Sequence, residues 1–291
     1  MRIVRRDFYD VSRADHFDLY PIGDCHVGAA ACDEDYLRRL VDCIAADDRA
    51  YWVGIGDFCD FINRSDPRFS FDSLAPWISA RMMTDLAGAQ RERFLSIVKP
   101  IASKCLAMAE GNHETSILKY YERDIYSEIV TGVREMGGYP DTHKLALGYT
   151  GWLRLAFHRS NEGSGRRITT FDIKVHHGYG GGRTPGPKTN RLQDMLLDND
   201  ADVVLFGHVH GVTLHSVWVE YLDKGNNVQQ RQRVGVITGT CLRSGNPAPD
   251  SGATYSERAG YRPQGAWGQV VRLRPGEDDV RRRIRVSTLD V

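Results

Sequence analysis

The chain has 291 residues, and its 38 Lys and Arg residues balance its 38 Asp and Glu residues, so the formal net charge is zero. Hydrophobic residues make up 41% of the sequence and charged residues 26%, which excludes a disordered or collagen-like chain. Broad capture of duplex DNA is also excluded, because proteins that bind duplexes in that way carry a basic excess that displaces counterions. No apolar run approaches the ~20 residues of a membrane span or forms a signal peptide, so we expect a cytoplasmic protein without a membrane partner.

Apolar periodicity predicts alternating strands and helices in the first half of the chain. Short apolar runs predict strands over 17–22, 51–55 and 104–109, and amphipathic spacing predicts helices over 33–47, 84–98 and 120–136. Residues 61–83 follow no clear period, and we interpret them as a long loop or short helices. Loops of that length are often functional, so we expect this segment to be a lid over a site.

The second half of the sequence is richer in predicted strands. Alternation over 152–158 and 168–175, with turn residues between them, predicts a hairpin. A helix is predicted over 189–197, and a wholly apolar run predicts a buried strand over 203–206. Further strands are predicted over 212–222, 229–238, 269–273 and 282–287. We therefore expect a single α/β domain over residues 1–291, with a β-rich C-terminal part over 211–291.

Pairs of polar side chains follow the predicted strands at the points where these strands end. Because the carboxyl ends of strands form the ligand-binding crevice of open α/β sheets, we expect these pairs to converge on one site. Imidazole, carboxylate and amide oxygen are ligands that suit borderline divalent metals. The pairs are Asp24 and His26, Asp57 and Asp60, Asn112 and His113, His176 and His177, and His208 and His210.

Taken in order, five motifs resemble the motif series of the calcineurin-like metallophosphoesterases. They are Gly23-Asp24-Cys25-His26, Gly56-Asp57-Phe58-Cys59-Asp60, Gly111-Asn112-His113-Glu114, His177-Gly178 and Gly207-His208-Val209-His210. The resemblance implies a fold of the metallo-dependent phosphatase type, and the stretch after Thr238-Gly239-Thr240 resembles phosphoesterases of bacteria and their viruses. That fold is a four-layer α/β/β/α sandwich with two mixed β-sheets.

The same resemblance implies a site for two divalent metal ions. The ligands that it implies are Asp24, His26 and His210 for one ion and Asn112, His177 and His208 for the other, with Asp57 bridging the two. Either His176 or His177 could be the ligand, and we favour His177 because the family's ligand directly precedes Gly. We expect manganese first, with iron, zinc, nickel or cobalt as alternatives.

The activity that the resemblance implies is hydrolysis of a phosphoester bond by a hydroxide that the two metal ions generate from water. His113 matches the family's general acid, and Asp60 matches the carboxylate that orients this histidine. Substrate contacts are a separate expectation from residue type. Arg183, Arg243 and Tyr179 could offer guanidinium groups and a stacking face to a phosphodiester.

These features leave several functions open. The first hypothesis is a phosphodiesterase or nuclease acting on a phosphoester substrate, with single-stranded nucleic acid or a nucleotide as its partner. The second is a small-molecule phosphatase or a nucleotide pyrophosphatase. A non-catalytic scaffold on the same fold is a remote alternative, because the chain keeps the acid histidine and every ligand of the family pattern. The oligomeric state is left open.

Overall fold

Twelve strands hydrogen-bond into one mixed sheet in this protein, whose computed structural model describes residues 1–161, 165–182, 184–244 and 265–289. The strands are β1 (Arg2–Phe8), β2 (Phe17–Gly23), β3 (Ala50–Gly56), β4 (Cys105–Ala109), β5 (Ala146–Gly148), β6 (Thr150–Asn161), β7 (Gly165–His176), β8 (Val203–Phe206), β9 (Val212–Leu222), β10 (Val228–Thr240), β11 (Trp267–Leu273) and β12 (Ile284–Leu289). Their order is β1-β6-β7-β8-β10-β11-β2-β3-β4-β5, while β9 pairs with β10 and β12 pairs with β11.

The sheet has two halves, which meet where β10 pairs with β11. Only Gly239 and Thr240 of β10 take part in that pairing, yet it joins all the strands into one path. The expectation of two separate sheets is therefore not confirmed, although the mixed α/β class is. Residues from the two halves pack together in one buried cluster, which includes Ile173 and Val53.

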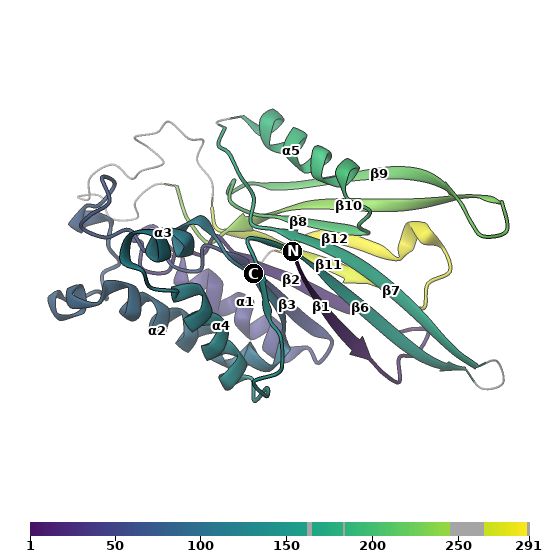
Figure 1. Cartoon of the computed structure of the whole chain (residues 1–291), viewed down its shortest axis with the longest axis horizontal. Helices are drawn as coiled ribbons and strands as arrows, with labels where there is room; N and C mark the ends of the chain where they lie inside the picture. Colours follow the sequence, from purple (N-terminus) through teal and green to yellow (C-terminus); the bar gives the residue numbers. More distant parts are fainter. Residues whose placement is uncertain (162–164, 183, 245–264, 290–291) are drawn as a thin grey trace.

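In the described part of the chain, five α-helices cover the outer faces of the sheet (Figure 1). They are α1 (Glu34–Ala46), α2 (Leu86–Val98), α3 (Asn112–Tyr121), α4 (Ile125–Met136) and α5 (Pro185–Asp198). Leu37 of α1 and Phe94 of α2 belong to the same buried cluster as Trp52 of β3. On the opposite side, Leu192 of α5 packs with Phe206 of β8. Helices therefore flank the strands on both sides.

The helix predicted over 120–136 is two helices, α3 and α4. Glu122 adopts a left-handed conformation with φ of 55°, which ends α3. Asp124 then caps α4 by accepting a hydrogen bond from the backbone N of Ser127 at 2.9 Å. The prediction missed this break because it followed the apolar period and overlooked the capping residue.

Strands β1 and β5 were also missed. In β1 only Val4 is buried, so the strand carries too few apolar residues to stand out. β5 has just three residues. Both pair through tertiary contacts, β1 with β6 and β5 with β4, and these partners lie far along the sequence.

Segment 61–83 contains a 3-10 helix, Phe71–Ser73, and the start of a second, Ala80–Thr84, as the lack of a clear period predicts. Backbone hydrogen bonds hold it to the loop that follows His26. The N of Ala30 donates to the O of Ser73 at 2.8 Å, and the N of Ala75 donates to the O of Gly28 at 2.9 Å.

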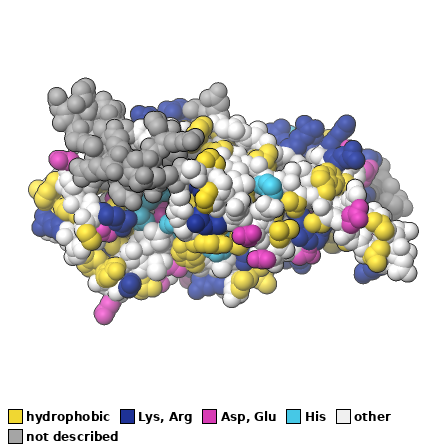
Figure 2. All heavy atoms as spheres, turned by 90° about the horizontal axis from the view of Figure 1, so that it is seen from above, with side chains coloured by type: hydrophobic (Ala, Val, Ile, Leu, Met, Phe, Trp, Pro, Cys, Tyr) yellow, Lys and Arg dark blue, Asp and Glu magenta, His cyan; other side chains and the backbone are white. Residues whose placement is uncertain are grey.

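The surface seen from above mixes basic, acidic and hydrophobic side chains (Figure 2), in keeping with the zero net charge. Among the helices of the described part of the chain, none combines the length and apolar character needed to cross a membrane.

Tyr126 provides a test of how α4 is tied to the sheet. Its buried hydroxyl donates to the O of Met108 at 2.7 Å and accepts from the N of Leu147 and of Gly148 at 3.1 and 3.2 Å. Tyr126→Phe leaves these backbone groups without their partner, so we expect the free energy of unfolding to fall by about 1–3 kcal/mol. Urea unfolding measures the loss, with Tyr9→Phe at an exposed tyrosine as the control. Equal stability of the two variants would contradict this role.

Candidate metal centre

The carboxyl ends of five strands meet at one edge of the sheet and carry the predicted polar pairs. Asp24 follows β2, Asp57 follows β3, and the remaining motifs follow β4, β7 and β8. The structure brings these side chains into three groups whose ligand atoms lie within 4.8 Å of one another. The groups are Asp24, His26 and His210; Asp57, His177 and His208; and His26, Asp60 and His113.

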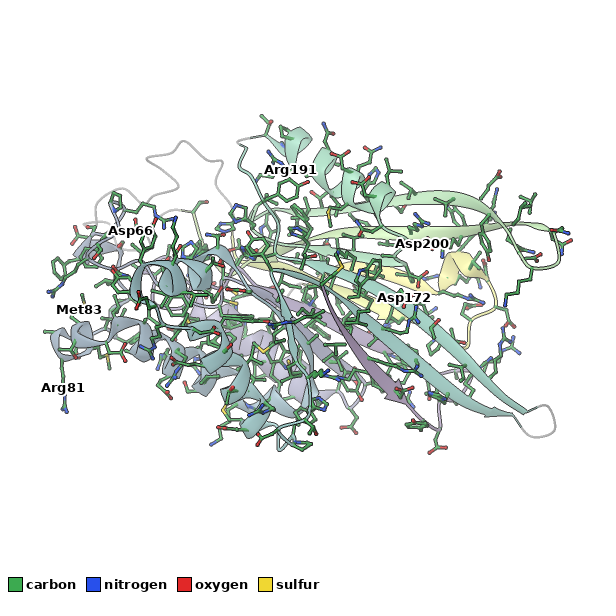
Figure 3. All side chains as sticks on the ribbon, viewed as in Figure 1. Asp66, Arg81, Met83, Asp172, Arg191 and Asp200 are labelled. Atoms are coloured by element: carbon green, nitrogen blue, oxygen red, sulfur yellow. The ribbon has the colours of Figure 1, made fainter. Side chains whose placement is uncertain are left out.

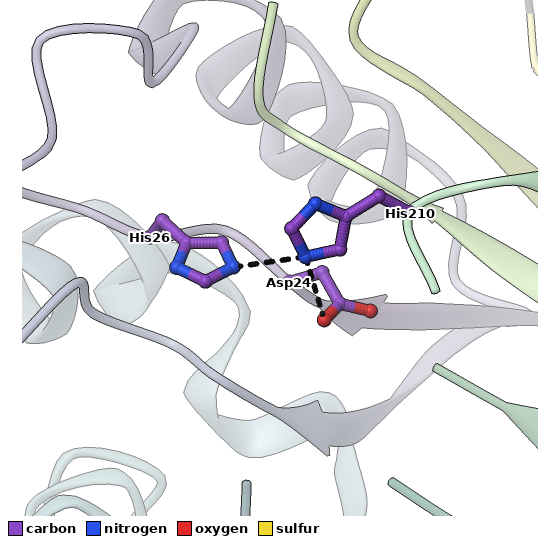
Figure 4. A group of neighbouring side chains, drawn as sticks. All are labelled: Asp24, His26 and His210. Atoms are coloured by element: carbon purple, nitrogen blue, oxygen red, sulfur yellow. Dashed lines mark hydrogen bonds and ion pairs between the residues drawn. The ribbon is translucent and has the colours of Figure 1, made fainter. Parts of the chain in front are cut away.

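The first group joins the end of β2 to the loop after β8 (Figure 4). Nε2 of His26 lies 3.2 Å from Nε2 of His210, which lies 3.5 Å from Oδ1 of Asp24. Oδ1 of Asp24 is buried and has no hydrogen-bond partner in the described part of the chain. Buried polar atoms normally have such a partner, so this oxygen and the facing Nε2 atoms of His26 and His210 fit a cation between them.

The second group centres on His177, which is fully buried. Its Nδ1 lies 2.8 Å from the O of Ile55, which directs Nε2 into the group. Nε2 lies 3.2 Å from Oδ2 of Asp57 and 3.0 Å from Oδ1 of Asn112. Although burial lowers it, the charge of Asp57 raises the pKa of His177 to about 9. The ring of His208 lies 5.3 Å from that of His177.

The carboxylate of Asp57 belongs to the second group and also faces the first. Its Oδ2 is 3.2 Å from Nε2 of His177 and 4.0 Å from Nε2 of His26. Burial alone would raise its pKa, but the neighbouring His113 and His177 hold the pKa of Asp57 well below its ordinary value. One carboxylate is thus in reach of ligands from both groups, which is the arrangement that a bridging ligand requires.

The structure separates the two adjacent histidines His176 and His177. His176 packs against Phe206 and Tyr179, and its Nδ1 accepts a hydrogen bond from the N of Gly178 at 2.8 Å. Burial lowers the pKa of His176 to about 4, so its ring is neutral. Since neighbours on a strand point to opposite faces, only His177 reaches the polar groups.

His113 and Asp60 are in contact, but through an atom of Asp60 that the sequence prediction did not anticipate. Nδ1 of His113 lies against the main-chain carbonyl of Asp60. The Asp60 carboxylate lies instead beside His26, with Oδ1 3.5 Å from Nδ1 of that ring. The main chain at Asp60 pairs with Val27 next to His26, its N donating to the O of Val27 at 3.1 Å, which places its side chain there.

Nε2 of His113 faces the centre, 4.0 Å from Oδ2 of Asp57. Burial lowers the pKa of His113, but the charges of Asp57 and Asp60 outweigh burial and raise it above its ordinary value.

The backbone is strained at the residues that carry these groups. Five of them have positive φ: Asp24 (47°), His26 (49°), Asp57 (51°), His208 (67°) and His210 (49°). Asp and His tolerate this left-handed conformation better than most residues, but it still costs about 1–3 kcal/mol at each position. Such residues cluster at functional sites, where the surrounding structure holds them in place against their strain.

Glu114 supports the position of Asp57 from beneath. Its buried carboxylate accepts hydrogen bonds from the N of Asp57, Phe58 and Gly111 at 2.9, 2.8 and 2.9 Å. Burial, and then the charge of Asp57, raise the pKa of Glu114 to about 7. A Cβ on Gly111 would lie 2.2 Å from the N of Asp57, so only glycine allows these two turns to approach.

Two further residues bind the main chain of the ligand-bearing loops, and they were not identified from the sequence. Lys188 of α5 donates to the O of Val209 at 2.6 Å, between His208 and His210. The hydroxyl of Thr240 donates to the O of Asp24 at 2.7 Å. Both contacts link distant parts of the chain, so no local pattern marks them.

Arg243 and Tyr179, two of the three predicted substrate contacts, lie outside the three groups. Arg243 pairs with Asp33, the capping residue of α1, its Nε donating to Oδ2 at 2.6 Å. Tyr179 is 44% exposed and packs beside His176, with the guanidinium of Arg191 6.0 Å from its ring. Arg183 lies outside the residues that the structure describes.

Comparison with known proteins identifies one family. The family model described as calcineurin-like phosphoesterase matches residues 20–212. No curated protein matches the chain. A solved structure of a Vps29 single mutant from Entamoeba histolytica is 12% identical with a TM-score of 0.35, covering 94% of this chain and 99% of that one. A conserved uncharacterized protein from Streptococcus pneumoniae, named as a predicted phosphoesterase, is 11% identical with a TM-score of 0.30 and the same coverage. Likenesses this distant do not bear on function.

Glu114 offers a test of the supporting contacts. Glu114→Ala leaves three buried N–H groups without an acceptor, so we expect the metal-free protein to lose about 3 kcal/mol or more of stability. Affinity for Mn²⁺ should also fall by about 10- to 100-fold, because the turn that carries Asp57 is no longer held. Urea unfolding and isothermal titration calorimetry measure the two effects.

Two further variants complete the Glu114 test. Glu114→Gln keeps the size of the side chain and an acceptor oxygen. We therefore expect it to lose less stability and less Mn²⁺ affinity than Glu114→Ala. Glu135→Ala removes an exposed carboxylate of α4 and serves as the control. Wild-type Mn²⁺ affinity in a folded Glu114→Ala protein would refute the supporting role.

Proposed function

Because the chain belongs to the calcineurin-like phosphoesterase family, we propose that it hydrolyses phosphoester bonds and that its preferred substrate is a phosphodiester. The observation that carries the proposal is the position of the Asp57 carboxylate between two groups of nitrogen and oxygen ligands. A shared carboxylate suits a pair of divalent ions, and paired ions are a common means of attacking phosphoesters.

Each group would hold one ion. Asp24, His26 and His210 would hold the first; Asn112, His177 and His208 would hold the second; and Asp57 would contact both. We propose manganese for both positions, and the same donor atoms also suit iron, zinc, nickel and cobalt. Two bound ions supply positive charge against the anionic phosphate oxygens and lower the pKa of the water that attacks phosphorus.

His113 would supply the proton that the leaving oxygen needs. Its Nδ1 faces the carbonyl of Asp60 and therefore carries a hydrogen, which leaves Nε2 as the atom that exchanges protons with substrate. Nε2 points to the same carboxylate that both ligand groups share. As the bond from phosphorus to the leaving oxygen breaks, a proton at Nε2 can pass to that oxygen.

We propose a diester rather than a monoester as the preferred substrate. A diester carries a second organic group, which needs a surface beside the centre. Segment 61–83 and α3 adjoin the ligand loops and offer such a surface. A phosphatase of small molecules would use the same ligands and acid. Turnover of bis-p-nitrophenyl phosphate against p-nitrophenyl phosphate separates the two, and faster turnover of the monoester would overturn the choice of a diester.

Asp57→Asn tests the shared carboxylate. An amide offers one neutral oxygen in place of two charged ones, so we expect kcat to fall by more than about 100-fold, beyond the loss typical of outer supporting groups. Turnover of bis-p-nitrophenyl phosphate and the metal content of the purified protein are the two measurements. The control is Asp172→Asn on β7, where the carboxylate pairs with Arg154 away from the centre (Figure 3). Full activity of Asp57→Asn with Mn²⁺ would refute the bridging role.

His113→Ala tests the acid. We expect kcat for bis-p-nitrophenyl phosphate to fall by about 10²–10⁴-fold, the usual contribution of a positioned acid. Metal content should stay near that of the wild type, because His113 lies outside the two ligand sets. Loss of metal together with activity would instead make His113 a ligand.

A further inference from the structure

An exposed set of aromatic and basic side chains lies on segment 61–83 and on the last turn of α3. We call it the rim, and it consists of the exposed Arg64, Arg68, Phe71, Lys119 and Tyr120, with the half-buried Phe69 against Phe71. Phe71 is 64% exposed and Tyr120 is 67% exposed. Segment 61–83, marked by Asp66 in Figure 3, and α3 lie at the same end of the molecule (Figures 1 and 3).

The rim is joined to the proposed catalytic centre through α3. This helix begins at Asn112 and His113 and ends at Tyr121, whose hydroxyl contacts Oδ1 of Asn63. With a rise of about 1.5 Å per residue, Tyr120 lies roughly 10 Å along the helix from His113. That distance is about the span of three stacked nucleotides at ~3.4 Å each.

Turns hold the rim residues of segment 61–83 in place. The N of Asp66 donates to the O of Asn63, and the N of Phe69 donates to the O of Asp66, each at 2.9 Å. The carboxylate of Asp66 accepts from the guanidinium of Arg68 at 2.7 and 3.0 Å.

Cations lie beside the exposed rings. The guanidinium carbon of Arg64 is 5.8 Å from the centre of the Phe71 ring, and Nζ of Lys119 is 5.1 Å from that of Tyr120. Phe69 meets Phe71 edge to face at 5.2 Å, which supports the exposed ring. Exposed rings with adjacent cations are what proteins use to bind single strands, stacking bases on the rings and placing phosphates by the cations.

We propose that the rim binds single-stranded nucleic acid, with unpaired bases stacked on Phe71 and Tyr120 and the phosphate chain leading to the centre. This inference rests on the proposed phosphodiesterase function and names its substrate class. A duplex is disfavoured, because paired bases cannot stack on the rings and the net charge of zero gives little general attraction to DNA.

Binding is tested separately from catalysis, on metal-free protein. Fluorescence anisotropy with a labelled single-stranded oligothymidylate should show that Phe71→Ala and Tyr120→Ala each weaken binding by on the order of tenfold. Phe71→Trp should restore it, because a larger ring still stacks. Trp218→Ala on β9 is the matched control: it removes another exposed ring, which has Arg281 5.9 Å from its centre. Unchanged binding in both rim variants, or an equal loss in the control, would overturn the inference.

Turnover gives the second test, on protein loaded with Mn²⁺. The loss of kcat/KM in Phe71→Ala should be about tenfold greater for the oligonucleotide than for bis-p-nitrophenyl phosphate, which has no base to stack. Hydrolysis of bis-p-nitrophenyl phosphate without any binding of the oligonucleotide would refute the rim and leave the proposed function standing. Binding of the oligonucleotide that depends on the rim, without hydrolysis of any ester, would refute the proposed function and leave the rim standing.

Discussion

The arrangement of this protein's candidate centre depends on one buried charge, the carboxylate of Asp57. A buried carboxylate is stable only with nearby positive charge and hydrogen-bond donors. The N of His113 donates to Oδ1 at 2.9 Å, and His177 and His26 face Oδ2. Two of the residues that stabilise Asp57, His177 and His26, are therefore also residues that could share metal ions with it, so the same side chains serve stability and the proposed function.

The backbone around Asp57 is also constrained by the position of the ligands. The loops that carry the ligands take left-handed turns directly after buried strands, and the strands hold these turns against their strain. Glu114 accepts from the turn after β3 and from the N-terminus of α3 together, so its carboxylate ties the ends of β3 and β4 to each other. Lys188 links the loop after β8 to α5 in the same way. A rigid sheet edge thus positions ligands that come from widely separated parts of the chain.

Different elements around the centre supply the proposed metal ligands and the proposed substrate surface. Strand ends supply the ligand groups, whereas segment 61–83 and the end of α3 supply exposed rings and cations at the proposed substrate surface. α3 connects the two, because His113 lies in its first turn and Tyr120 in its last. A single helix therefore relates the proposed acid to the surface on which we place the substrate.

The sequence by itself determined the alternation of strands and helices, the family and the residues whose side chains gather at the sheet edge. These follow from local information: apolar periods mark buried strands, and Gly, Asp and His at their ends mark tight polar turns. It could not decide between His176 and His177, because the choice depends on which strand face looks onto Asp57. The contact of His113 with the Asp60 carbonyl, the support from Glu114 and the joining of the sheet halves at Gly239 likewise arose only in the tertiary structure. Each depends on the approach of segments distant in sequence, and no local pattern encodes that approach.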